Sequence, residues 1–107
     1  MAYKLIVTDR ADELIDNLTG YLLYRLNNTD AAIRFLNELG KVYNRLNENP
    51  FQFSECSDIY LSRKGYRDAL LTGMNYRVVY RVEDDFVYIV GVFHVREDYG
   101  KKVIPSS

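Results

Sequence analysis

Apolar positions along the chain follow one period in its first half and another in its second half. Residues 3–8 (YKLIVT) alternate and are rich in β-forming side chains, which predicts a short strand. Apolar residues then recur every three or four positions across residues 10–26, and again from Ala32 to Leu46. This is the spacing of amphipathic helices. The first half therefore predicts one strand followed by two helices.

Polar residues mark the ends of these two helices. Thr8 or Asp9 is a suitable N-cap for the first helix, and Thr29 for the second. The second helix should end before Pro50, because proline disfavours a helical residue in front of it. The short link between the helices predicts an antiparallel helical hairpin.

The second half of the chain is typical of strands. Residues 51–60 show no clear period and are expected to form a loop. Three segments rich in β-forming residues follow, YRDALL at 66–71, YRVVYRV at 76–82 and FVYIVGVFHV at 86–95. The order β-α-α-β-β-β predicts an α+β fold, with the helical hairpin packed on one face of an antiparallel sheet.

The last two strands should form a hairpin, and its register decides where the charged residues lie. A two-residue turn at Asp84-Asp85 would pair Glu83 with Phe86, Arg81 with Tyr88, Val79 with Val90, Arg77 with Val92 and Asn75 with His94. Directly opposed residues share a sheet face. One face would then carry Arg77, Arg81, His94 and Arg96. The other face, turned toward the helices, would carry Tyr76, Val78, Tyr80, Val82, Val87, Ile89, Gly91 and Phe93.

Length and composition narrow the class of protein. The 107 residues are expected to form a single domain over 1–107, with the last few as a flexible tail. The lone Cys56 excludes an internal disulfide and suits a reducing cytoplasm. The sequence has no apolar run long enough to span a membrane. It shows neither a glycine-rich phosphate loop nor metal-ligand spacing, so no cofactor and no metal are expected.

Basic side chains are concentrated in one stretch although the net charge is −1. Residues 59–82 contain five basic residues (Arg63, Lys64, Arg67, Arg77 and Arg81) and a single acidic one, Asp68. Two interpretations are open: solvated strand edges, or a local site for an anionic partner. Arginine binds phosphate oxygens, histidine transfers protons near neutral pH, and tyrosine stacks on bases. This inventory suits cleavage of an RNA backbone by its own 2′-hydroxyl, whereas His94 alone would more simply be a strand-end residue.

The order of these segments resembles a known family. YKLIVTDRADELIDNLTGYL, AAIRFLNELGKVYNRLNENP, the sheet segment from Gly65 and the ending HVREDY together resemble the toxins of type II toxin–antitoxin modules, the RelE/ParE superfamily. The resemblance covers Tyr3 to about Lys102. It implies a curved sheet, and as partner a cognate antitoxin that covers the active surface in a toxin–antitoxin hetero-oligomer.

The resemblance also implies roles for individual residues. Arg77 matches the arginine that RNA-cleaving members place against the scissile phosphate, and His94 and Arg96 fall where those members carry their last catalytic groups. Arg67 lies near a basic position of RelE-like members, and Tyr99 near a base-stacking tyrosine. Arg81 joins Arg67 and Tyr99 as a candidate for substrate binding.

Two mechanisms follow from the resemblance. ParE-like members inhibit DNA gyrase, whereas RelE-like members are metal-independent endoribonucleases that cut ribosome-bound messenger RNA. The sequence has a pI of about 5.8, and Asp68, Ala69 and Leu70 stand where RelE-like members have lysines. An acidic protein is repelled by the phosphates of ribosomal RNA. Both departures favour the gyrase inhibitor, with the RNA-cleaving toxin as the alternative.

Overall fold

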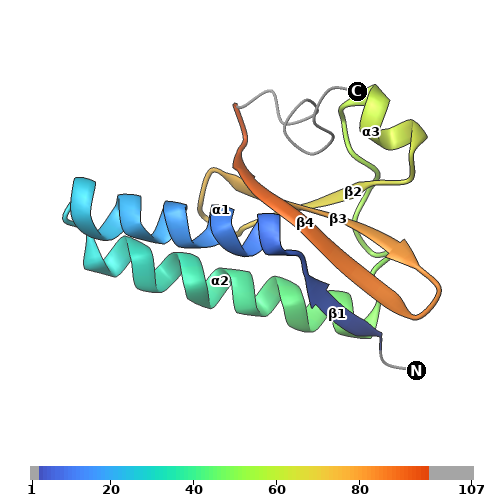
Figure 1. The fold of residues 1–107 in the computed structure, drawn as a ribbon, viewed down its shortest axis with the longest axis horizontal. Coiled ribbons are helices and arrows are strands. Elements are labelled where there is room, and N and C mark those ends of the chain that lie inside the picture. Colours follow the sequence, from blue (N-terminus) through green and yellow to red (C-terminus); the bar gives the residue numbers. More distant parts are fainter. Residues whose placement is uncertain (1–2, 97–107) are drawn as a thin grey trace.

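The computed structural model describes residues 3–96, so Tyr99 and the expected flexible tail lie outside the described residues. The elements in chain order are β1 (Lys4–Val7), α1 (Asp9–Gly20), the π-helical turn η1 (Tyr21–Arg25), α2 (Thr29–Glu48), α3 (Ile59–Arg63), β2 (Arg67–Leu70), β3 (Tyr76–Glu83) and β4 (Phe86–His94). Figure 1 shows α1 and α2 side by side, with α3 apart from them near the start of β2. The predicted α+β fold is confirmed.

The four strands form one sheet in the order β1-β4-β3-β2. The β2–β3 and β3–β4 pairs are antiparallel, as expected. β1 instead runs parallel to β4, with Lys4 opposite Phe86 and Val7 opposite Ile89. A parallel pair needs a long crossover, and the helices and two strands between β1 and β4 supply it. The sheet is therefore mixed rather than purely antiparallel.

The helical hairpin buries its apolar stripe against one face of the sheet. Thr8 begins α1, because its Oγ1 accepts the Ala11 backbone N–H at 3.2 Å. α2 is capped by Asn28 rather than by the predicted Thr29, since the Asn28 side chain accepts the Ala31 N–H at 3.0 Å. The core between the layers consists of Ala11, Ile15, Leu22, Ala32, Phe35, Leu39, Val42, Leu46, Ala69, Leu71, Val78, Tyr80, Val87, Ile89 and Val92.

The opposite face of the sheet carries a second, smaller apolar cluster of buried residues: Cys56, Leu61, Val79 and Phe93. It is covered by α3, which lies partly in the segment expected to be a loop. Asp58 begins this helix by accepting the Leu61 N–H at 3.0 Å. A helix of five residues is too short to show a 3.6-residue period, which is why the sequence did not predict it.

A β-bulge in the β3–β4 hairpin changes which side chains share a face. The two-residue turn is confirmed, with Glu83 opposite Phe86 and Arg81 opposite Tyr88. The register then shifts between Val79 and Tyr80. An extra residue in one strand reverses the side-chain alternation beyond it. The predicted pairs 79–90, 77–92 and 75–94 are therefore wrong.

The register beyond the bulge is Val79 with Gly91, Val78 with Val92, Arg77 with Phe93 and Tyr76 with His94. Gly91 is required here. A Cβ at this position would lie 2.5 Å from Phe93 Cε2 and 3.4 Å from Leu14 Cδ1. The Phe93 ring, buried to 1 % exposure, occupies the space that a side chain would need. Gly91 and Phe93 therefore face α3, and the prediction that they face the helical hairpin is wrong.

Candidate functional site

The bulge separates the residues that the sequence grouped into one site. Arg77 lies opposite Phe93 on the α3 face of the sheet, whereas His94 lies opposite Tyr76 on the face of the helical hairpin. The shared Arg77–His94 site is therefore wrong. A phosphate bound by Arg77 would lie across the sheet from the imidazole.

Arg77 is held by several groups on the α3 face, near the start of β3. One guanidinium nitrogen, Nη1, donates to Asp68 Oδ2 at 3.0 Å and to Ser57 Oγ at 3.5 Å. The other, Nη2, donates to the Val95 carbonyl at 3.0 Å. The side chains of Arg77 and Asp68 are each 14 % exposed. The guanidinium thus joins β2, β3, the segment before α3 and the residue that follows β4.

Arg81 lies on the same face nearer the hairpin turn, and it is more exposed. It forms an ion pair with Glu83, and its guanidinium carbon lies 4.4 Å from the centroid of the Tyr88 ring. The side-chain hydrogen bond with Glu83 raises the pKa of Arg81. Arg81 is therefore fixed by its two neighbours on the sheet.

Arg67 lies on the opposite face from Arg77, because it pairs with Tyr80. Its Nη1 donates to the Phe53 carbonyl at 2.6 Å, and its guanidinium lies 5.3 Å from the Phe51 ring centroid. The neighbouring Tyr80 hydroxyl donates to the Pro50 carbonyl at 2.6 Å, and burial raises the pKa of this tyrosine. Arg67 therefore anchors the segment that leaves α2, away from the other predicted site residues.

His94 and Arg96 meet at the end of β4. The His94 ring packs edge-on against Tyr76 with 5.6 Å between centroids. Its Nδ1 accepts the Arg96 backbone N–H at 3.1 Å, so in the neutral ring the proton resides on Nε2. The Arg96 residue is exposed in the turn that follows the strand.

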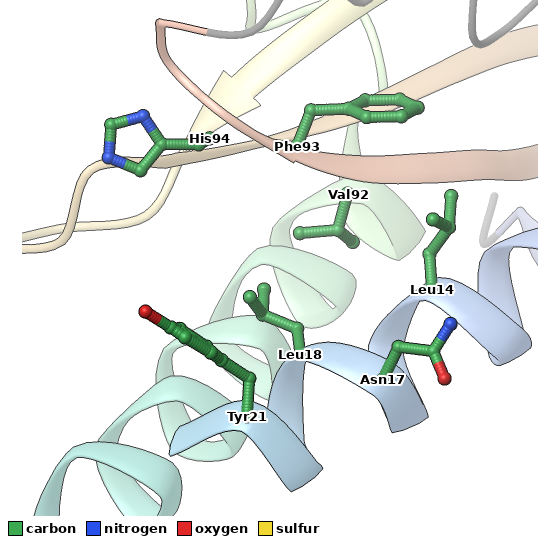
Figure 2. A pocket seen from close by; sticks show the side chains of 7 residues that line it. All are labelled: Leu14, Asn17, Leu18, Tyr21, Val92, Phe93 and His94. Atoms are coloured by element: carbon green, nitrogen blue, oxygen red, sulfur yellow. The ribbon is translucent and has the colours of Figure 1, made fainter. Parts of the chain in front are cut away.

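A pocket of about 190 Å³ opens between α1 and the end of β4, beside His94. Figure 2 shows Leu14 and Leu18 of α1 pointing toward β4, with the Tyr21 ring below His94. Val92 and Phe93 supply apolar surface from the strand, and Asn17 lies on the outer side of α1. The sequence did not predict this pocket, because Leu14 and Leu18 belong to the apolar stripe of the first helix and the predicted register placed His94 on the other face of the sheet.

Asp68 and Ser57 are polar side chains on the α3 face that accept hydrogen bonds from the Arg77 guanidinium. Between residues 3 and 96, no group of three His, Cys, Asp or Glu side chains is arranged to hold a metal ion. Within the same range, no helix is both long and apolar enough to cross a bilayer.

Several solved structures resemble this fold, and three of them are described here. The first is the chromosomal ParDE toxin–antitoxin system of P. aeruginosa, with a TM-score of 0.71, 16 % identity and coverage of 87 % of this chain and 96 % of that one. The second, E. coli RelE in the free state with two arginines replaced by alanine, has a TM-score of 0.63 at 20 % identity, covering 96 % and 90 %. The third is the RelBE2 toxin–antitoxin complex of Mycobacterium tuberculosis, with a TM-score of 0.56 at 21 % identity, covering 88 % and 99 %.

Sequence comparison identifies the family of this chain. A search of curated protein sequences found no match. The family model of the ParE toxin of the type II toxin–antitoxin system parDE matches residues 5–99, which is most of the chain. The chain therefore belongs to the ParE toxin family of type II toxin–antitoxin systems.

Proposed function

We propose that this ParE-type toxin acts by binding DNA gyrase, and that a cognate antitoxin neutralises it. The observation that carries the proposal is the engagement of Arg77 by Asp68 and by the Val95 carbonyl. An arginine must present its guanidinium to a phosphate in order to stabilise a cleavage transition state. Here that group already has a carboxylate partner, and His94 lies across the sheet.

Electrostatics supports a protein target over ribosomal RNA. The chain carries a net charge of −1, which gives no long-range attraction to a polyanion. Two of the three other candidate arginines are also engaged, Arg81 with Glu83 and Arg67 with a backbone carbonyl. Inhibition by surface complementarity needs no catalytic group. We also propose that the toxin acts in the cytoplasm, because DNA gyrase and the alternative target, messenger RNA, are both found there.

The antitoxin belongs to the proposal because the family is defined by such pairs. Two of the similar structures are a ParDE system and a RelBE2 toxin–antitoxin complex. We expect the chain to inhibit growth when expressed alone, and to be silent when the neighbouring reading frame is co-expressed. The two proteins should co-purify as a hetero-oligomer. Normal growth despite soluble expression would contradict a toxin.

The deciding experiment compares the two mechanisms, first with purified proteins and then in cells. Purified toxin should block supercoiling of relaxed plasmid by DNA gyrase, with antitoxin restoring the activity. In cells, induced toxin should lower plasmid supercoiling before any loss of full-length messenger RNA. Rapid cleavage of translated messages with supercoiling intact would instead establish the RNA-cleaving mechanism.

A further inference from the structure

Helix α3 presents an outer surface that combines apolar and basic side chains. Ile59 is 67 % exposed and Tyr60 is 51 % exposed, although both are large and apolar. Arg63, the last residue of the helix, and Lys64, which follows it, are exposed as well. Figure 1 shows α3 apart from α1 and α2, so the helical hairpin does not cover it. We call these four side chains the α3 surface.

Helical spacing makes the four side chains neighbours. Ile59 and Arg63 are four positions apart, and so are Tyr60 and Lys64. Lys64 Nζ lies 5.1 Å from the centroid of the Tyr60 ring, which is the distance of a cation–π contact. The ring orients the ammonium group and leaves its positive charge in place. The α3 surface is therefore one continuous patch of apolar and positively charged groups.

Both cations of the α3 surface differ from the engaged arginines of the sheet. The ion pairs formed within the described part of the chain involve neither Arg63 nor Lys64. Glu55, a carboxylate of the preceding segment, accepts a hydrogen bond from Ser62 Oγ at 3.1 Å. Residues 59–67 contain three basic side chains and no acidic one. The surface thus has a local positive charge in a chain whose net charge is −1.

The backbone beneath the α3 surface is fixed by the fold. Leu61, the buried residue of the helix, belongs to the apolar cluster on this face of the sheet. Asp58 caps the first turn. Gly65 has a φ of +85° and reverses the chain, so that the Tyr66 N–H donates to the Leu61 carbonyl at 3.1 Å. A surface that is already ordered loses little conformational freedom when it binds.

We propose that the α3 surface binds the target protein, DNA gyrase, at a site where carboxylates lie beside apolar side chains. The inference rests on the proposed function, because it assigns a surface of the toxin to the target named there. Arg63 and Lys64 complement acidic side chains. A nucleic-acid backbone would also attract these two cations, but it would leave Ile59 in water. A protein surface can cover both kinds of side chain, and tyrosine and arginine are frequent anchors of protein interfaces.

The test measures the affinity of the purified toxin for DNA gyrase of the same organism by isothermal titration calorimetry, together with inhibition of supercoiling. Two variants alter the α3 surface. Tyr60→Ala removes the exposed ring, and Arg63→Glu with Lys64→Glu reverses the charge. Each should weaken binding and inhibition by about tenfold or more. Arg63→Lys with Lys64→Arg keeps the charge and should bind nearly as tightly as the unaltered chain.

Matched controls change the same kinds of side chain on the helical hairpin. Tyr24→Ala removes an exposed tyrosine of η1, and Arg25→Glu with Arg45→Glu reverses the charge of two exposed arginines. Both controls should bind gyrase like the unaltered chain. Circular dichroism and urea unfolding check that every variant is folded, so that a loss of binding is not a loss of structure.

Several outcomes would overturn the proposal. Equal gyrase affinity of the α3 variants and the controls would remove the target from α3. Full gyrase affinity with weakened antitoxin binding would assign the surface to the antitoxin. Binding of a duplex DNA fragment that charge reversal abolishes, with gyrase affinity unchanged, would assign it to nucleic acid. If the unaltered chain itself did not bind gyrase, the proposed function would fail together with the inference, whereas failure of the inference alone leaves the unaltered chain active.

Discussion

Replacing Arg77 by alanine should lower the free energy of unfolding, and not only remove an activity. The substitution takes away the cation paired with Asp68 at 3.0 Å and the donor to the Val95 carbonyl at 3.0 Å. A hydrogen bond to a charged group contributes about 1.5–3 kcal/mol, and truncating one member of a fully buried pair costs about 3–5 kcal/mol. Because both side chains keep 14 % exposure, we expect a loss of about 2–4 kcal/mol for Arg77→Ala.

A double-mutant cycle separates the ion pair from the other contacts of Arg77. Asp68→Ala alone should cost about 1–3 kcal/mol, since the guanidinium keeps the Val95 carbonyl and Ser57. The double variant should cost less than the sum, by a coupling of about 1–2 kcal/mol. The chain contains no tryptophan, so urea unfolding is best followed by far-ultraviolet circular dichroism.

Arg81→Ala is the matched control. Its ion pair with Glu83 has side chains 36 % and 59 % exposed, so its loss should cost no more than about 1 kcal/mol. An unchanged urea midpoint for Arg77→Ala, together with loss of toxicity, would refute the structural role. It would return Arg77 to the catalytic role that the sequence suggested.

Three further substitutions test the packing and protonation that the structure shows. Gly91→Ala should destabilise by about 1–3 kcal/mol, because its Cβ would meet the immobile ring of Phe93, and thermal unfolding measures this. Leu39→Ala, at 4 % exposure, should cost about 2–5 kcal/mol in urea unfolding. Burial raises the pKa of Tyr43 to about 12, so its contribution to stability is complete below pH 10 and is lost as pH rises from 10 to 12. Tyr43→Phe should flatten this decline by at most about 1.4 kcal/mol per pH unit.

Each of these predictions has a control within the chain. Gly40→Ala should raise stability by up to about 1 kcal/mol, because nothing lies within 4 Å of its added Cβ and alanine favours a helix. Leu36→Ala, at 45 % exposure, should cost much less than Leu39→Ala. Tyr24→Phe, at 80 % exposure, is the matched substitution at the surface. Equal effects within any of these pairs would contradict the burial on which they rest.

Periodicity predicted the elements that are long enough to repeat it. The predicted ends of the helices lie within a residue or two of the observed ones when α1 and η1 are taken together. Apolar positions such as Ile15, Leu22 and Phe35 do form the core stripe. Capping was less certain, since Asn28 and Thr29 are both good caps and the difference depends on backbone geometry. The parallel pairing of β1 was not predictable, because strand order is a property of the whole sheet.

The residues of the predicted site were wrongly grouped. Arg77, Arg81 and His94 do lie on neighbouring strands, but the alternation was extrapolated through Gly91. An isolated glycine inside a strand is a known signal of a bulge, and it was the one indication available in the sequence. The pairing of Asp68 with Arg77 was not predictable, because it depends on the register of β2 against β3.

The one-residue bulge thus separates Arg77 from His94, two side chains that could otherwise act on the same phosphate. In a regular hairpin, His94 would lie diagonally beside Arg77, about 7–8 Å away, and the two could hold one phosphate. The bulge moves the imidazole to the helical side, where it borders the pocket between α1 and β4. Asp68 pairs with the guanidinium that remains on the other face. The side chains predicted to form one catalytic site are thus divided between an ion pair on one face of the sheet and the edge of a pocket on the other.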